Sequence, residues 1–419
     1  MISQRQRWQW SMTGVVALFI AIGCGGGGGN PGSAEVEIIT DAHAVAYQIG
    51  DAAWKDDLTV ENLTDGRRRY TFDQTGRYGV ALYCKNTADK GVTVFHLTTT
   101  ESRSVIQNCG RGASAVISGT VTDQTGVANI KGYALSMGMG SDGYDIVPKN
   151  NTAYSIKAAK GSRDLVTVSL AKDSNNKIVP QRFHIERGIN FLGGIVGHVV
   201  TMTAANTQTM QGYDLTRAAN TKGYAFLITE HEAQFRADTD GKWYLPSSGL
   251  LEKDSYLFYG VHIHNDTSYL EVYAANSVPA ADKVIDASYV AALLGTGYTK
   301  ATGKFDGLDY TPSASSQPMK YFVLNTKKTA TNEWYYAILS VGWMDSGETY
   351  TLPDLSSLAG FSGMWNGQQA DKASTSITMS NKSIGEMFQT KKVYAPEKSQ
   401  NYFFVIPGAK HEIAYEQIL

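Results

Sequence analysis

Apolar and polar residues alternate along most of the chain beyond residue 34, in short runs that Gly, Asn and Asp residues interrupt. A period of two is typical of β-strands with one buried face, and the interruptions indicate turns. A helix is indicated only near Ala287–Leu294. The pattern therefore predicts an all-β protein, with antiparallel β-sandwich domains arranged in tandem.

The first sandwich is predicted between residues 34 and 111. Its strands are expected at Glu35–Thr40, Val45–Ile49, Tyr70–Phe72, Arg77–Cys84 and Val92–Thr98. Turn residues such as Asp65-Gly66 separate these runs. A unit of this size and pattern resembles a small immunoglobulin-like sandwich.

The second sandwich is predicted between residues 112 and 190. It contains Ile117-Ser118-Gly119-Thr120-Val121, a tyrosine strand at Asn151–Ile156 and, after Gly161, the apolar row of Asp164–Ala171. This order resembles the carboxypeptidase-regulatory-like, or transthyretin-like, β-sandwich, although the segment Gly132–Pro148 is longer and richer in glycine than is usual. The resemblance covers about one fifth of the chain. It implies a non-catalytic module that acts as a spacer, an adhesion unit or a binding accessory.

Residues 191–419 are predicted to form a β-rich C-terminal region, either as one domain or as two, at 191–300 and 301–419. Within it, the run Trp334–Trp343 is apolar on both faces, which is typical of a central strand.

The clearest hairpin lies between Ser255 and Ala274. A two-residue turn at Asn265-Asp266 pairs His264 with Thr267 and, in the same register, Val261 with Leu270. This register places the paired apolar residues on one face, as a buried side requires.

The N-terminal residues 1–23 have the three parts of a secretory signal peptide. Arg5 and Arg7 provide the positive start, and the uncharged run Gly14–Gly23 precedes Cys24. About ten apolar residues suit a signal-peptide core, whereas a transmembrane helix needs about 20. The sequence Ala21-Ile22-Gly23-Cys24 resembles the lipobox of bacterial lipoproteins, with Ala where Leu is commoner. The resemblance implies cleavage before Cys24 and acylation of its sulfur and its new amino group.

Residues 24–33 continue as a glycine-rich tether, which has no side chains to bury and behaves as a flexible coil. By resemblance to Gram-negative lipoproteins, Gly25 after the acylated cysteine implies the outer membrane, at its periplasmic face or at the cell surface. Several acyl chains hold a protein to a bilayer almost irreversibly, at about 0.8 kcal/mol per buried CH₂. The alternative is an ordinary signal peptide in which Cys24 is incidental.

The two remaining cysteines, Cys84 and Cys109, are expected to form a disulfide outside the cytoplasm. The chain-entropy model gives such a loop about 3 kcal/mol of stabilisation. A reduced pair of buried thiols is the alternative.

Composition narrows the function classes. With 37 basic and 39 acidic residues the formal net charge is −2, which gives no electrostatic reason to expect a nucleic-acid partner. No intact catalytic motif is present, and no organic cofactor is expected.

His262 and His264 are candidate zinc ligands. Residues two apart on a strand project from one face, and the expected register places Glu271 on that face as well. Two imidazoles and a carboxylate suit Zn²⁺. The alternative is that these are surface or interface histidines.

The same face of the hairpin is predicted to carry four aromatic side chains that suit stacking on sugar rings. They are Tyr256, Phe258, Tyr269 and Tyr273. The alternative is that this face packs against a second sheet.

These features predict a lipid-anchored cell-envelope protein that is not an enzyme and has a binding, adhesion or structural role, with a glycan or protein as ligand. The alternative is an extracytoplasmic carbohydrate-processing hydrolase, or its carbohydrate-binding accessory, with a site in the C-terminal region.

Overall fold

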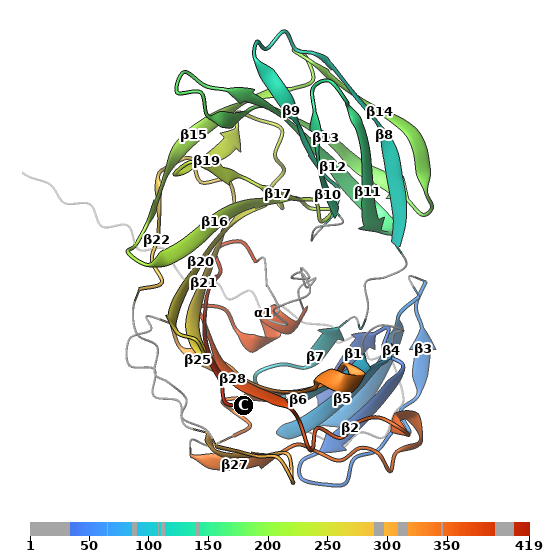
Figure 1. Cartoon of the computed structure of the whole chain (residues 1–419). Helices are drawn as coiled ribbons and strands as arrows, with labels where there is room; N and C mark the ends of the chain where they lie inside the picture. The colour runs from blue at the N-terminus through green and yellow to red at the C-terminus, as the bar shows by residue number, and fades with distance from the viewer. Residues whose placement is uncertain are drawn as a thin grey trace, which may run out of the picture.

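The fold is all-β, as the alternating pattern predicts. In the computed structural model of the chain (Figure 1), α1 (Ile384–Gln389) is the single α-helix of the described part. The described residues are 34–64, 66–85, 90–107, 109, 114–138, 143–288, 297–308, 317–344, 347–389 and 406–419.

An eleven-stranded central sheet curves through the molecule (Figure 1). Its strands are, in spatial order, β17 (Gln234–Arg236), β16 (Thr221–Ile228), β20 (Ser255–Asn265), β21 (Ser268–Asn276), β29 (Lys410–Gln417), β28 (Lys372–Ser380), β25 (Met319–Lys328), β26 (Glu333–Ser340), β6 (Lys90–Thr98), β5 (Arg77–Lys85) and β2 (Ala44–Ile49). Neighbours are antiparallel except β26 and β6, which run parallel.

This parallel pair joins an N-terminal strand to a C-terminal one. Glu333 lies opposite Lys90, and Leu339 lies opposite His96. The three strands β2, β5 and β6 of the predicted first sandwich therefore continue into a sheet built by the C-terminal region. The backbones approach closely at Gly91, where an added Cβ would lie 2.2 Å from the carbonyl oxygen of Trp334.

Smaller sheets cover both faces of this part of the central sheet. One, the β1 sheet, consists of β3 (Val60–Asn62), β4 (Arg68–Gln74), β1 (Ala34–Thr40) and β7 (Ser104–Gln107). The other, the β24 sheet, consists of β23 (Gly297–Thr299), β24 (Lys304–Leu308) and β27 (Glu348–Thr351). On β5, Val80 and Leu82 belong to the core under the β1 sheet, while Ala81 and Tyr83 belong to the core on the opposite face. Burial on both faces explains the nearly continuous apolar run of this strand.

A second sheet pair lies beside the central sheet (Figure 1). Its eight-stranded sheet consists of β10 (Tyr144–Pro148), β9 (Ile130–Ser136), β12 (Gly161–Lys172), β13 (Ile178–Phe191), β15 (Gln208–Arg217), β19 (Lys242–Pro246) and β18 (Asp238–Thr239), with β22 (Lys283–Ile285) beside β15. The β8 sheet consists of β11 (Ala153–Ala159), β8 (Ser114–Gln124) and β14 (Ile195–Thr203). Tyr133 and Leu165 pack toward the β8 sheet, whereas Phe183 and Trp243 pack toward β16 and β20. The eight-stranded sheet is thus buried on both sides.

The sheets cross the predicted domain boundaries. The boundary between residues 190 and 191 falls at the end of β13, and that between 300 and 301 falls inside the β23–β24 hairpin, where Thr299 pairs with Lys304. Ala287 and Ser288, at the start of the expected helix, are not helical, and residues 289–296 lie outside the described residues.

The predicted hairpin at Ser255–Ala274 is present as β20 and β21, but its predicted register is wrong by one residue. Asn265 Oδ1 accepts hydrogen bonds from the N–H and the hydroxyl of Thr267, at 2.8 and 2.9 Å. The turn is consequently Asp266-Thr267, and a bulge before Asn265 places His262 opposite Leu270 instead of Tyr269. Even-numbered residues of β20 thus share a face with even-numbered residues of β21.

The close approach at Gly91 yields a test of the β6–β26 junction. We expect Gly91→Ala to lower the free energy of unfolding by about 1–3 kcal/mol, because the methyl group overlaps backbone as well as the Trp334 ring. Gly193→Ala is the control, since a Cβ there meets no atom within 4 Å. Urea unfolding of the full chain measures both variants, and equal stability of the two would contradict the close packing.

Candidate functional site

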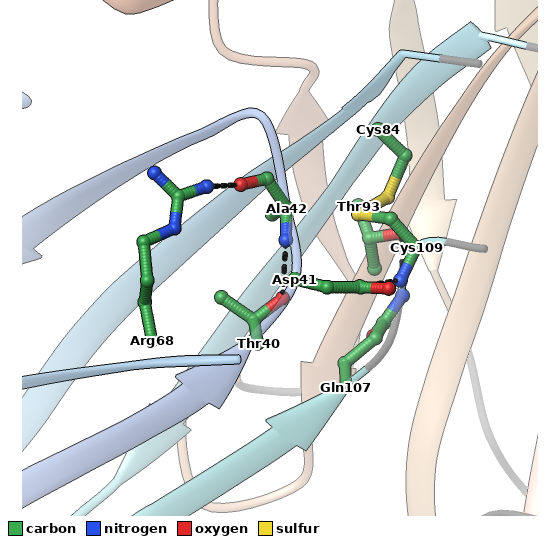
Figure 2. Close-up of a disulfide and its surroundings, with 8 residues drawn as sticks. All are labelled: Thr40, Asp41, Ala42, Arg68, Cys84, Thr93, Gln107 and Cys109. Atoms are coloured by element: carbon green, nitrogen blue, oxygen red, sulfur yellow. Dashed lines mark hydrogen bonds between the residues drawn. A yellow bond between two sulfur atoms is a disulfide. The ribbon is translucent and has the colours of Figure 1, made fainter. Parts of the chain in front are cut away.

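The disulfide ties two sheets together. Cys84 lies near the end of β5 in the central sheet, and Cys109 follows β7 of the β1 sheet; their Cα atoms are 5.0 Å apart. Figure 2 shows the Cys109 N–H directed at Asp41 and the Gln107 amide directed at Thr93. The Gln107 Nε2 donates to the Thr93 Oγ1 at 3.2 Å. The pairing of Cys84 with Cys109 is confirmed. Cys24 lies outside the described residues, so its acylation stays a prediction.

The predicted zinc set is not assembled. His262 and His264 lie near one another, with ring centroids 4.8 Å apart, and burial together with the neighbouring His262 lowers the pKa of His264. Glu271, however, pairs with Val261 and projects from the opposite face, where it accepts hydrogen bonds from the Tyr259 and Tyr273 hydroxyls. Among the described residues no three His, Cys, Asp or Glu side chains are grouped to hold a metal ion.

The predicted sugar platform is divided between the two faces of the sheet. Tyr256 and Phe258 pack against Trp243 in the core below the eight-stranded sheet. Tyr273 is buried on the other face, where Tyr269 stacks on Tyr415 of β29, with centroids 4.5 Å apart. The one-residue register difference separates the two pairs, so the prediction of one exposed aromatic face is wrong.

Two clusters of titratable groups come together that the sequence pattern does not reveal. The first centres on Arg187 of β13, which lies between the fully buried carboxylates of Asp164 and Asp254. Its guanidinium donates to both oxygens of Asp254 and, at 3.1 Å, to Asp164. A bidentate pair of this kind fixes geometry as well as charge.

Asp164 is also held by His231, whose Nδ1 lies 2.9 Å from Oδ1. Burial alone would raise the pKa of the Asp164 carboxyl, but hydrogen bonds from the Gly188 N–H and the Thr229 hydroxyl, with the charge of Arg187, hold that pKa below its usual value. No other described side chain hydrogen-bonds to the His231 ring, so the dyad lacks a nucleophile. This cluster fastens β12 and β13 to the segments that flank β16 and β20.

The second cluster consists of His184 and Glu186 on β13 and His198 on β14; we call it the histidine–carboxylate cluster. Nε2 of His198 lies 2.9 Å from one Glu186 oxygen, and Nε2 of His184 lies 3.6 Å from the other. The carboxylate therefore bridges two imidazoles across the two sheets of the pair. All three side chains are largely, but not fully, buried.

Local backbone geometry aims His198 at this carboxylate. β14 is bulged between Val196 and His198, at Gly197 with φ +75°. Opposite the bulge an added Cβ on Gly119 would lie 1.7 Å from the His198 carbonyl oxygen, so this position requires glycine. The glycine of the motif Ile117–Val121 is thus explained by strand contact. The three cluster residues themselves have no sequence signal, because they come from two strands of different sheets.

No protein-family model and no curated protein matches the chain. Among solved structures, a Streptococcal ancillary pilin aligns with a TM-score of 0.16 and 9% identity, over 60% of this chain and 98% of the pilin. A leucine-rich repeat protein from Bacteroides thetaiotaomicron aligns with a TM-score of 0.15 and 8% identity, over 41% of this chain and 27% of that protein. At such TM-scores neither likeness supports an argument. No described helix is long and apolar enough to cross a bilayer.

We expect removal of the disulfide by the double variant Cys84→Ser/Cys109→Ser to lower the free energy of unfolding by about 3 kcal/mol, because the unfolded chain regains the freedom of the closed loop. Urea unfolding measures the loss. The control is the wild-type protein unfolded with and without reductant, which should lose the same amount. Two free thiols in peptide maps of the native protein would contradict the pairing.

The histidine–carboxylate cluster predicts a pH-dependent contribution to stability. The Glu186 hydrogen bond raises the pKa of His184, so this contribution is complete below the ordinary histidine value of 6.5 and is lost as the pH rises through the folded-state pKa. Burial alone would raise the pKa of Glu186, but His184 and His198 lower it, so its contribution is present above 4.5 and is lost as the pH falls.

Both contributions are therefore present between about pH 4.5 and 6.5. We expect Glu186→Gln to destabilise the protein more at pH 5.5 than at pH 8, as measured by urea unfolding at each pH. The control is Glu61→Gln, which removes an exposed ion pair with Arg69 and should have a small effect at both. An equal loss from Glu186→Gln at both values would refute the coupling.

Proposed function

We propose that this protein is anchored to the bacterial cell envelope by lipid on Cys24 and has a binding, adhesion or structural role without catalysis. The observation that carries the envelope placement is the Cys84–Cys109 disulfide. A disulfide of this kind persists in oxidising compartments and is rare in the cytoplasm. It supports the export that the N-terminal signal sequence and Cys24 predict.

The proposal that the protein is not an enzyme rests on the ion pairs and hydrogen bonds that its buried polar groups make. Arg187 pairs with both Asp164 and Asp254, and the ring of His231 contacts Asp164 but has no hydroxyl or thiol partner among the described side chains. Glu186 is shared between two histidines. Each of these two clusters fastens one sheet to another, as is typical of a rigid scaffold. A binding partner such as a glycan or a protein would contact the surface of that scaffold.

Labelling of the full chain in cells with radioactive palmitate tests the anchor. We expect the wild type to incorporate label and to fractionate with the outer membrane, and we expect Cys24→Ser to do neither, because the acylated sulfur is lost. The control is Cys84→Ser, which changes another cysteine and should leave labelling intact. Undiminished labelling of Cys24→Ser would refute lipid attachment at this residue.

A further inference from the structure

Four buried polar atoms near the turn of the β20–β21 hairpin have no hydrogen-bond partner in the described part of the chain. They are Nδ1 of His262, Nε2 of His264, Oγ1 of Thr221 and Oγ of Ser268. A buried polar atom left unpaired costs about 1–3 kcal/mol, so folded proteins pair most such atoms with protein groups, ordered water or a bound ion. Four of them in one place point to a common ligand.

The strand register brings these four residues to one place. Thr221 of β16 lies directly opposite His262, so the two side chains share a face of the sheet. Ser268 of β21 lies opposite Asn265, at the bulge that contains His264. A hydroxyl therefore borders the histidine pair on each side, one from β16 and one from β21.

A crossing segment covers the sheet beside the histidine pair. At Gly260, two residues before His262 and on the same face, an added Cβ would overlap the side chain of Ile285 and would lie 3.8 Å from the Cβ of Ala287. Residues 285–287 therefore pass over β20 next to the pair. This explains why ring nitrogens so close to the end of a hairpin are shielded from solvent.

The spacing of the two imidazole rings suits a metal ion. An ion bound to one nitrogen of each ring at about 2.0 Å, with an angle of about 90–110° at the metal, puts the ring centroids about 4.5–5 Å apart. The centroids of His262 and His264 are 4.8 Å apart, which falls in this range. Glu271 projects from the opposite face, so this hairpin supplies two imidazole ligands without a carboxylate.

We propose that His262 and His264 bind one late first-row transition-metal ion through Nδ1 and Nε2, and that Cu²⁺ binds most tightly. Imidazole nitrogen suits copper, nickel and zinc, and Cu²⁺ has the highest affinity of these divalent ions for such ligands. Water completes the coordination. The hydroxyls of Thr221 and Ser268 hydrogen-bond to that water and hold it in place, so one ion with its water satisfies all four unpaired atoms.

Isothermal titration calorimetry with Cu²⁺ tests the site on the full chain carrying Cys24→Ser, prepared without a histidine tag and freed of metal with EDTA. We expect one equivalent to bind. We expect His262→Asn and His264→Asn each to raise the dissociation constant at least about tenfold, because each variant removes a nitrogen ligand. The matched control is His43→Asn, which removes an exposed histidine and should leave the affinity unchanged.

Electron paramagnetic resonance of the unsubstituted histidine pair keeps the proposal testable if a histidine variant misfolds. With one equivalent of Cu²⁺ we expect coupling to two imidazole nitrogens. A signal from oxygen ligands alone, or equal affinity of His262→Asn and the parent protein, would overturn the proposal and leave water as the partner of the four atoms. Loss of binding in His198→Asn would also overturn it, by placing the ion at the histidine–carboxylate cluster. None of these results bears on palmitate labelling, so failure of this inference is distinct from failure of the lipid anchor.

Discussion

The parallel pairing of β6 with β26 holds the described structure together. Without it, β2, β5 and β6 would end in an open edge at β6, and the β1 sheet would cover an isolated three-stranded remnant. With it, a single hydrogen-bonded sheet extends from β2 to β17 and provides faces for cores on both sides. The closeness of Gly91 to Trp334 shows how little space this junction leaves.

Local pattern predicts the elements well. The all-β class, five strands of the first eighty described residues and the β20–β21 hairpin all follow from alternation and turn residues. The local pattern does not predict which strands distant in sequence pair with one another, because nothing in β6 distinguishes β26 from any other apolar strand. The tandem organisation inferred from sequence therefore misses the sheets that cross its boundaries.

The candidate sites failed for a related reason. A bulge between Ile263 and Asn265 leaves His262 opposite Leu270 instead of Tyr269. With a side-chain period of two, this one-residue difference moves Glu271 and two tyrosines to the opposite face. The disulfide was predictable because, once Cys24 is assigned to the lipid anchor, Cys84 and Cys109 are the two cysteines that remain. The clusters around Arg187 and Glu186 could not be predicted, since their members lie far apart in the sequence and only the packing of the sheets and their flanking segments brings them together.

The wide sequence separation of β6 and β26 has a consequence for biogenesis. A polypeptide is synthesised from its amino end, so residues 90–98 are present long before residues 333–340 arrive to complete their sheet. Until then a buried strand of the native protein has an exposed apolar edge, and loop closure over so many residues is slow. Folding of the first strands must wait for nearly the last ones, which leaves the incomplete chain exposed to aggregation in the meantime.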